Sequence, residues 1–285
     1  MAAIAYVNGR YGRIDLPAVM VEDRGYQFAD AVYEVIKVVG GRVLDLERHL
    51  DRLERSLGEL AIAMPTSRAA LTQILKEALR RSRQADALLY IQVGRGVAPR
   101  NHAFPKAAKP SLVVTVRRPR WPSEDERTRG VKVVTRPDTR WRRCDVKSVS
   151  LLPNVLARQA AADAGCREAW LVDDAGRVRE GSASNAYIVD RDGRLITHPL
   201  GPEILGGVTR QVVLEIARSL QIEVVERPFT LEEARAAPEA ALSSTSSLLL
   251  PVVAIDGRPV GDGAPGPVIR RIAELYEDRM RRREA

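Results

Sequence analysis

The chain has 285 residues, 45% of them hydrophobic and 29% charged, which predicts a folded globular protein of one large or two smaller domains. Its net charge of +8 comes from basic residues mostly interleaved with acidic ones, and the few aromatic residues do not alternate with them, so a basic nucleic-acid-binding protein is only an alternative. Two cysteines exclude a disulfide framework, and the absence of a secretion signal predicts a cytoplasmic protein.

The first third of the chain combines strand and helix patterns. Strand-like runs cover 3–7, 32–39, 42–45, 87–93 and 112–117. Gly40-Gly41 predicts a hairpin turn after the run over 32–39. Within that run, Tyr33 and Glu34 are expected to point to opposite faces of the strand. Leucines at helical spacing predict helices over 46–60 and 71–79. In the first helix, His49 and Arg52 lie three residues apart and project from one flank.

A stiff segment with two prolines predicts an interdomain linker over 119–123, between a small domain over 1–118 and a larger one over 124–285. The larger domain holds short strands with turns at Gly176, Gly193 and Gly257. Helices are predicted over 153–164, 208–220 and 267–282. Strands and helices do not alternate regularly, so we expect a two-domain α+β fold and not a doubly wound nucleotide-binding sheet.

Lys147 is one of only six lysines among 45 basic residues, and it lies in the arginine-rich stretch that runs from Trp141 to Ser148. An amine can lose its proton and attack a carbonyl, whereas a guanidinium group stays charged. A lysine retained in such a stretch points to Schiff-base chemistry. An ordinary surface lysine is the alternative interpretation.

A Schiff base with pyridoxal phosphate requires a carboxylate near the ring nitrogen and donors for the phosphate. Glu180, between a turn and a strand, is a candidate for the first, with a hairpin-edge carboxylate as the alternative. Gly206-Gly207-Val208-Thr209 precedes an apolar helix and offers N–H groups to a phosphate. Ser243–Ser247 and Arg52 are further candidates, with a polar loop and a solvated arginine as alternatives.

The segment from Pro99 to Pro105 is a loop bounded by prolines that contains Arg100 and His102. Two residues apart on an extended loop, these side chains are expected to point the same way. That arrangement suits a substrate carboxylate, and an ordinary surface loop is the alternative.

Taken in order, these motifs resemble the D-amino-acid aminotransferases among the class IV aminotransferases, which are fold-type IV pyridoxal-phosphate enzymes. The segments that carry the resemblance are Asp23–Glu34, Asp145–Ala157, Glu180–Asn185 and Leu205–Arg210. Branched-chain aminotransferases, (R)-amine transaminases and aminodeoxychorismate lyases share these four. Arg100-Asn101-His102 looks like the D-amino-acid branch, while Ala29, Ala31 and Ala183 replace residues that the family usually has as glycine or serine.

The resemblance implies a role for each matching residue. Lys147 matches the Schiff-base lysine, and Glu180 matches the partner of the pyridine nitrogen. The residues that match contacts to the phosphate are Arg52, Val208, Thr209 and Thr245. Leu205 and Ser244 match residues near the cofactor ring. Tyr33 matches part of a trap for the substrate α-carboxylate, to which Arg100 and His102 are added from the partner subunit of a homodimer.

The activity that the resemblance implies is transamination between D-amino acids and 2-oxo acids, with D-alanine and 2-oxoglutarate giving pyruvate and D-glutamate. A branched-chain L-amino-acid aminotransferase or an (R)-amine transaminase is the enzymatic alternative. No metal is expected.

Overall fold

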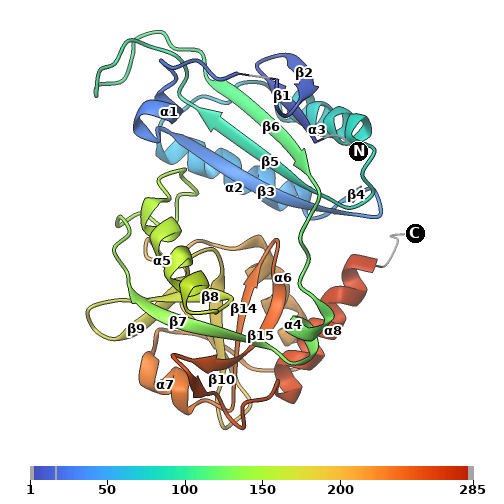
Figure 1. Cartoon of the computed structure of the whole chain (residues 1–285), viewed down its shortest axis with the longest axis vertical. Helices are drawn as coiled ribbons and strands as arrows, with labels where there is room; N and C mark the ends of the chain where they lie inside the picture. Colours follow the sequence, from blue (N-terminus) through green and yellow to red (C-terminus); the bar gives the residue numbers. More distant parts are fainter. Residues whose placement is uncertain (1–2, 17, 282–285) are drawn as a thin grey trace. The chain divides into compact units, whose positions relative to one another are not determined.

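The computed structural model describes residues 3–16 and 18–281, which form two compact units (Figure 1). The first unit consists of the residues up to Arg120 together with Val146–Ser150. The second consists of Trp121–Asp145 and the residues after Ser150. The sequence interpretation had assigned Lys147 to a domain over 124–285, whereas its five-residue segment belongs to the first unit.

The first unit is built on a six-stranded antiparallel sheet with the order β2-β1-β6-β5-β3-β4. Its strands are Ile4–Val7 (β1), Arg10–Arg13 (β2), Ala31–Val39 (β3), Arg42–Val43 (β4), Ala87–Gly94 (β5) and Ser111–Arg117 (β6). The strands expected around 3–7, 32–39, 42–45, 87–93 and 112–117 are therefore present, and β2 is an addition. Gly40 and Gly41 form the predicted turn, with positive φ angles of 57° and 80° that favour glycine.

Two long helices cover one face of this sheet. They are Leu46–Glu59 (α2) and Arg68–Ser82 (α3), and a short helix, Arg24–Phe28 (α1), precedes β3. Leu50, Leu53 and Leu57 of α2 are fully buried against alternate residues of β3, including Val32 and Ile36, while Leu46 is partly buried. Burying each such side chain contributes about 1.5–3 kcal/mol. Because side chains alternate along a strand, Glu34 lies on this buried face and Tyr33 on the opposite one.

The segment Val146–Ser150 joins the first unit because it extends the sheet. β4 pairs only with Val38 and Val39 at the end of β3, so the edge of the first half of β3 needs another partner. The Tyr33 N–H donates to the Lys147 carbonyl at 2.9 Å, and the Val149 N–H donates to the Ala31 carbonyl at 3.0 Å. The Lys147 segment therefore takes the place of a short extra strand.

The second unit contains a ten-stranded mixed sheet with the order β12-β11-β10-β14-β15-β7-β8-β9-β13, in which β16 pairs with β15. The strands are Val131–Pro137 (β7), Glu168–Val172 (β8), Arg177–Gly181 (β9), Asn185–Val189 (β10), Leu195–Thr197 (β11), Val224–Glu226 (β12), Phe229–Thr230 (β13), Glu239–Ser244 (β14), Leu248–Ile255 (β15) and Arg258–Pro259 (β16). The absence of regular alternation between strands and helices confirms the predicted α+β class.

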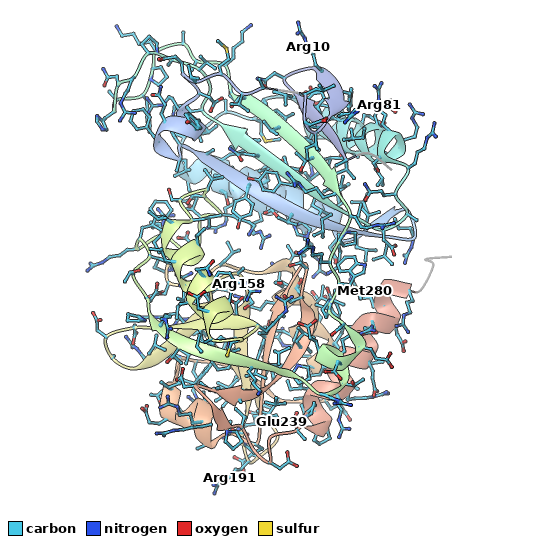
Figure 2. The ribbon with its side chains drawn as sticks, viewed as in Figure 1. Arg10, Arg81, Arg158, Arg191, Glu239 and Met280 are labelled. Carbon is cyan, nitrogen blue, oxygen red and sulfur yellow. The ribbon has the colours of Figure 1, made fainter. Side chains whose placement is uncertain are left out.

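The helices of the second unit are Glu124–Thr128 (α4), Leu152–Asp163 (α5), Val208–Ser219 (α6), Leu231–Ala236 (α7) and Pro267–Arg281 (α8). The three long ones agree with prediction, although Arg282, the expected end of α8, lies outside the described residues. The short helices α4 and α7 were missed, yet both begin with a capping box, Ser123 with Glu126 and Thr230 with Glu233. At α8, the buried carboxylate of Glu239 (Figure 2) accepts hydrogen bonds from two N–H groups of the first turn.

Among residues 3–16 and 18–281, no helix combines the length and the apolar character needed to cross a membrane. The same residues contain no group of three histidine, cysteine or acidic side chains that could hold a metal ion. Cys144 and Cys166 are free thiols.

Candidate active site

Lys147 lies against Tyr33 on the sheet face that points away from α2 and α3. The Lys147 Nζ is 4.2 Å from the centroid of the Tyr33 ring. On its other side, Tyr33 stacks with Tyr90 of β5, with ring centroids 5.6 Å apart. The backbone of Lys147 is held by Tyr33 and by Ser56 of α2, whose hydroxyl accepts from the Lys147 N–H at 3.3 Å. The half-buried amine is thus attached to a rigid strand and is not an ordinary surface lysine.

Arg52 is held by Glu34 beneath α2. Its Nε and Nη2 donate to the two Glu34 carboxylate oxygens at 2.7 and 2.8 Å, and His49 Nδ1 lies 2.7 Å from the second oxygen. Glu34 is fully buried, and burial alone would raise its pKa, but Arg52 and His49 outweigh this and lower the pKa to about 2. The interpretation of Arg52 as a solvated arginine is wrong, because only 9% of its side chain is exposed.

The loop with Arg100 and His102 leaves β5 at the end of the sheet where β3 begins, because Gly94 of β5 pairs with Ala31. Both side chains are exposed, and the loop bends at His102 instead of running extended. They nevertheless gather on one ring: the Arg100 guanidinium is 4.6 Å from the Phe28 ring centroid, and the two ring centroids of His102 and Phe28 are 5.3 Å apart.

Glu180 is enclosed in the second unit. It is 5% exposed and lies on β9, which pairs with both β8 and β13, so the hairpin-edge interpretation is wrong. Its carboxylate pairs with the Arg140 guanidinium and accepts from Asn185 Nδ2 at 3.0 Å and from the Leu205 N–H at 3.1 Å. Burial raises the pKa of Glu180, and the positive charge of Arg140 opposes that rise.

The loop that leads into α6 is connected to the Glu180 carboxylate through Asn185. Asn185 Nδ2 also donates to the Leu205 carbonyl at 2.9 Å and so ties the loop before α6 to β10. The N-cap residue Gly207 provides no side-chain cap, and a Cβ there would lie 2.1 Å from Asn185 Oδ1, so only glycine fits. The Thr209 hydroxyl is buried and has no hydrogen-bond partner among the residues that the structure describes. A buried donor beside free helix N–H groups is the pattern of an anion site.

Ser244 and Thr245 lie at the turn between β14 and β15. The Ser244 hydroxyl accepts from the Ser247 N–H at 3.0 Å, which orders the turn, and Ser247 in turn accepts from Arg167 at 3.1 Å. Ser243 pairs with Asn185 in the sheet, so the turn continues from the end of β14 that is next to the start of β10. The serine-rich segment is therefore an ordered turn rather than a loose polar loop.

The candidate residues are divided between the two units. Tyr33, Arg52, Lys147 and the Arg100 loop are in the first, while Glu180, Leu205, Val208, Thr209, Ser244 and Thr245 are in the second. The sequence interpretation missed two structural partners, Glu34 and Arg140. Glu34 stood out only as a charged residue in an apolar strand. Arg140 carried no signal, because arginine is the commonest basic residue of the chain.

Comparison with known proteins identifies the family. Residues 31–255 match the amino-transferase class IV family. The chain is 40% identical over 274 residues to the D-alanine aminotransferase of Bacillus licheniformis, covering 95% of each chain. It is 37% identical over 273 residues to the D-alanine aminotransferase of Staphylococcus aureus strain MSSA476, covering 95% of this chain and 96% of the relative.

Solved structures agree on the fold. The branched-chain amino acid aminotransferase of Escherichia coli superimposes with a TM-score of 0.90 at 23% identity, covering 98% of this chain and 94% of that one. The branched-chain aminotransferase of Thermoproteus uzoniensis with norvaline gives a TM-score of 0.87 at 26% identity, covering 98% and 95%. With a family match over most of its length and relatives at this identity, the chain belongs to the class IV aminotransferases.

Proposed function

We propose that the chain is a D-amino-acid aminotransferase that uses pyridoxal 5'-phosphate and converts D-alanine and 2-oxoglutarate to pyruvate and D-glutamate. The support is twofold. Relatives named D-alanine aminotransferase are 37–40% identical over 95% of the chain. The Arg100-x-His102 loop, which motivated the same prediction from the sequence, lies at the end of β5 beside the start of β3, close in the sheet to Tyr33.

The residues of the second unit fit the phosphate of the cofactor, and the main support is the environment of Thr209. The buried Thr209 hydroxyl has no partner within residues 3–16 and 18–281, and the N-cap of α6 makes no side-chain hydrogen bond. A phosphate group would accept from the hydroxyl and from the Val208 N–H, which removes the cost of leaving a buried polar group unpaired, about 1–3 kcal/mol. Thr245, Ser244 and Leu205 complete this proposed contact set, as the family resemblance implies, and Arg52 supplies the countercharge.

When bound, pyridoxal phosphate draws electrons away from the substrate α-carbon. Glu180 supports this by accepting a hydrogen bond from the protonated ring nitrogen. The role needs an ionised carboxylate, and Arg140 favours the ionised form against the effect of burial. Asn185 and the Leu205 N–H fix the direction of the carboxylate. Arg140 is thus a positioning residue for Glu180.

Lys147 performs the proton transfer. Its amine would hold the cofactor, and its Nζ would take a proton from the substrate α-carbon and return a proton as the product forms. Tyr33, with Arg100 and His102, binds the substrate α-carboxylate. Because the carboxylate is fixed on one side, only one enantiomer presents its α-hydrogen to Lys147, and this selects D-amino acids.

We further propose that the enzyme is a homodimer in which Arg100 and His102 act in the partner's site. Near this loop several large apolar side chains are exposed, namely Met20, Val21, Tyr26 and Phe104, each at least 62% exposed. An exposed apolar cluster of this kind is typical of a surface that binds another protein, here a second copy. Free Cys144 and Cys166 agree with the expected cytoplasmic location.

Half-reactions test the activity directly. Mixing the cofactor-loaded enzyme with D-alanine or L-alanine and recording the cofactor absorbance should give conversion with the D-enantiomer only. Conversion with L-amino acids instead would establish the branched-chain alternative. Borohydride reduction followed by peptide mapping should locate the cofactor on Lys147, and an adduct on another lysine would contradict the assignment.

Hybrid dimers test the contribution across subunits. When an Arg100→Ala subunit is combined with a Lys147→Ala subunit, one site of each hybrid should carry both changes and the other none. The hybrids should then recover about half of wild-type activity, provided that the two sites are independent. Activity that stays at the level of the two mutants would mean that the loop serves its own subunit.

A further inference from the structure

A buried arginine, Arg24, grips the backbone of the loop that carries Arg100 and His102. Arg24 is the first residue of α1 and is only 3% exposed. Its Nη1 donates to the carbonyls of Asn101 and Ala103, and its Nη2 donates to the carbonyl of His102 at 3.3 Å. Three consecutive carbonyls of one loop thus converge on one guanidinium group.

The side chain of Arg24 is held in place by the carboxylate of Asp30. Its Nε donates to the Asp30 carboxylate at 2.8 Å, and the same carboxylate binds Arg95 Nε at 2.7 Å. Arg95 in turn donates to the carbonyls of Leu60 and Ala61, at the end of α2. Because Asp30 immediately precedes β3, its carboxylate anchors Arg24 to the sheet of the first unit, whereas Arg95 donates to the same carboxylate but to none of the three loop carbonyls that Arg24 binds.

The backbone around Arg24 is locked as well. Its N–H donates to the Gly96 carbonyl at 3.0 Å, and Asp23 caps α1 by accepting from the Gly25 N–H at 2.8 Å. Gly96 has a φ of +108°, and a Cβ there would lie 2.0 Å from the Lys109 carbonyl oxygen, so another residue cannot take its place without a shift. The start of α1 and the start of the loop are therefore held together.

The same helix positions the loop side chains. The ring of Phe28, at the end of α1, contacts both the Arg100 guanidinium and the His102 ring. A cation placed over an aromatic ring is attracted to it, which favours one rotamer of an otherwise solvated arginine. Arg24 thus fixes the loop backbone, while Phe28 fixes the direction of two side chains.

We propose that Arg24 is a positioning residue for substrate-carboxylate recognition: it sets the conformation of the 100–102 loop and so determines affinity for amino and oxo acids without touching the substrate. The inference rests on the proposed function, because the loop is taken to bind a carboxylate. It adds a residue outside the binding groups, one that acts on the loop through the contacts of its own guanidinium group with three loop carbonyls.

The test compares Arg24→Lys with Arg95→Lys. Both variants keep a positive charge beside Asp30, but only Arg24→Lys removes the fork that binds three loop carbonyls, since lysine is a point donor. KM for D-alanine and for 2-oxoglutarate should each rise about tenfold in Arg24→Lys, and kcat at saturation should change less than threefold. In Arg95→Lys both KM values should stay within about twofold, even if the protein is less stable.

Two further readouts separate loop positioning from a general structural defect. (R)-1-phenylethylamine has no carboxylate, so its half-reaction rate should be the same in Arg24→Lys and wild type. Hydrogen exchange of the 100–104 amides in the cofactor-free protein should be faster in Arg24→Lys than in Arg95→Lys, with unchanged exchange in β3 and β5. This measurement does not depend on activity.

The outcomes are distinct. Unchanged KM values in Arg24→Lys, or equal rises in both variants, would overturn the role of Arg24. An equal loss of rate with the carboxylate-free amine would also overturn it, because the loop would then not act through the carboxylate. If wild-type enzyme does not convert D-alanine at all, the proposed function fails, and this result is independent of either variant.

Discussion

The surroundings of Glu34 in the first unit and of Thr209 in the second differ in how completely the protein satisfies a buried polar group. Glu34 has both carboxylate oxygens bound by Arg52 and His49. Thr209 has a buried hydroxyl that nothing in the described chain binds. A satisfied group contributes to the stability of the fold, whereas an unsatisfied one costs stability until a ligand arrives. The Glu34 carboxylate therefore supports the structure of the site, whereas the Thr209 hydroxyl is available to bind the cofactor.

Replacing Glu34 should disrupt its cluster with Arg52 and His49 and cause the largest loss of stability. Glu34→Ala leaves Arg52 buried without its countercharge, and a guanidinium cannot lose its proton to escape this. The expected loss in unfolding free energy is about 3–5 kcal/mol, measured by urea denaturation of the cofactor-free protein. The control is Glu47→Ala on α2, the helix that carries Arg52, where the acidic side chain is 74% exposed and the loss should stay below about 1 kcal/mol.

Acid should weaken the same arrangement without mutation. The pKa of Glu34 is lowered to about 2 in the fold from its ordinary value of 4.5. A lowered carboxylate pKa stabilises the fold above the unfolded value, and this contribution is lost as the pH falls from 4.5 towards 2. The loss should be on the order of 3 kcal/mol. Denaturation curves collected across this window should show it, and a Glu34→Gln protein should show a smaller dependence.

Arg52→Ala should cost less than Glu34→Ala, about 2 kcal/mol, because His49 can take up a proton and replace the missing charge. In the wild-type fold burial lowers the pKa of His49, with Glu34 opposing. Arg52 also lowers that pKa, so its removal should raise the pKa of His49, and the compensation is then present at low pH and is lost as the pH rises. The variant should therefore be less impaired at pH 6 than at pH 8. Equal impairment at both would exclude compensation by His49.

Thr209→Val tests the unsatisfied hydroxyl of the second unit, and its expected effect is the smallest of these changes. The dissociation constant of pyridoxal phosphate should rise about tenfold, about 1.4 kcal/mol. The cofactor-free protein should lose no stability, because valine removes an unpaired hydroxyl. Thr72→Val is the matched control: the Thr72 hydroxyl donates to the Arg68 carbonyl at 2.9 Å, so that change should lower stability slightly and leave cofactor affinity unaltered. A loss of stability in Thr209→Val would show that its hydroxyl has a structural partner.

Local patterns in the sequence predicted most of the fold. The leucine stripe of α2 and the Gly40-Gly41 turn depend on neighbours within a few residues, and both were predicted. The position of the Lys147 segment was not, because it depends on the unpaired half of β3, more than a hundred residues earlier in the chain. A pairing of that kind leaves no periodic signal.

The candidate site shows the same division. Arg52 and Thr209 were selected by motif, but the partner of the first and the isolation of the second could be seen only in three dimensions. Both faces of β3 carry apolar residues, so the sequence could not tell that Glu34 lies on the buried one. Arg140 was hidden among many arginines, and only its pairing with Glu180 distinguishes it.

The way Val146–Ser150 completes the edge of β3 has a consequence for synthesis on the ribosome. β3 ends at Val39, and the residues that cover the edge of its first half opposite β5 are made only after about a hundred more. At 5–20 residues per second this leaves a growing chain with an incomplete sheet edge for roughly 5–20 seconds. Open edges promote aggregation during that time, so a fragment that stops at Arg120 should require chaperones more than the full chain does.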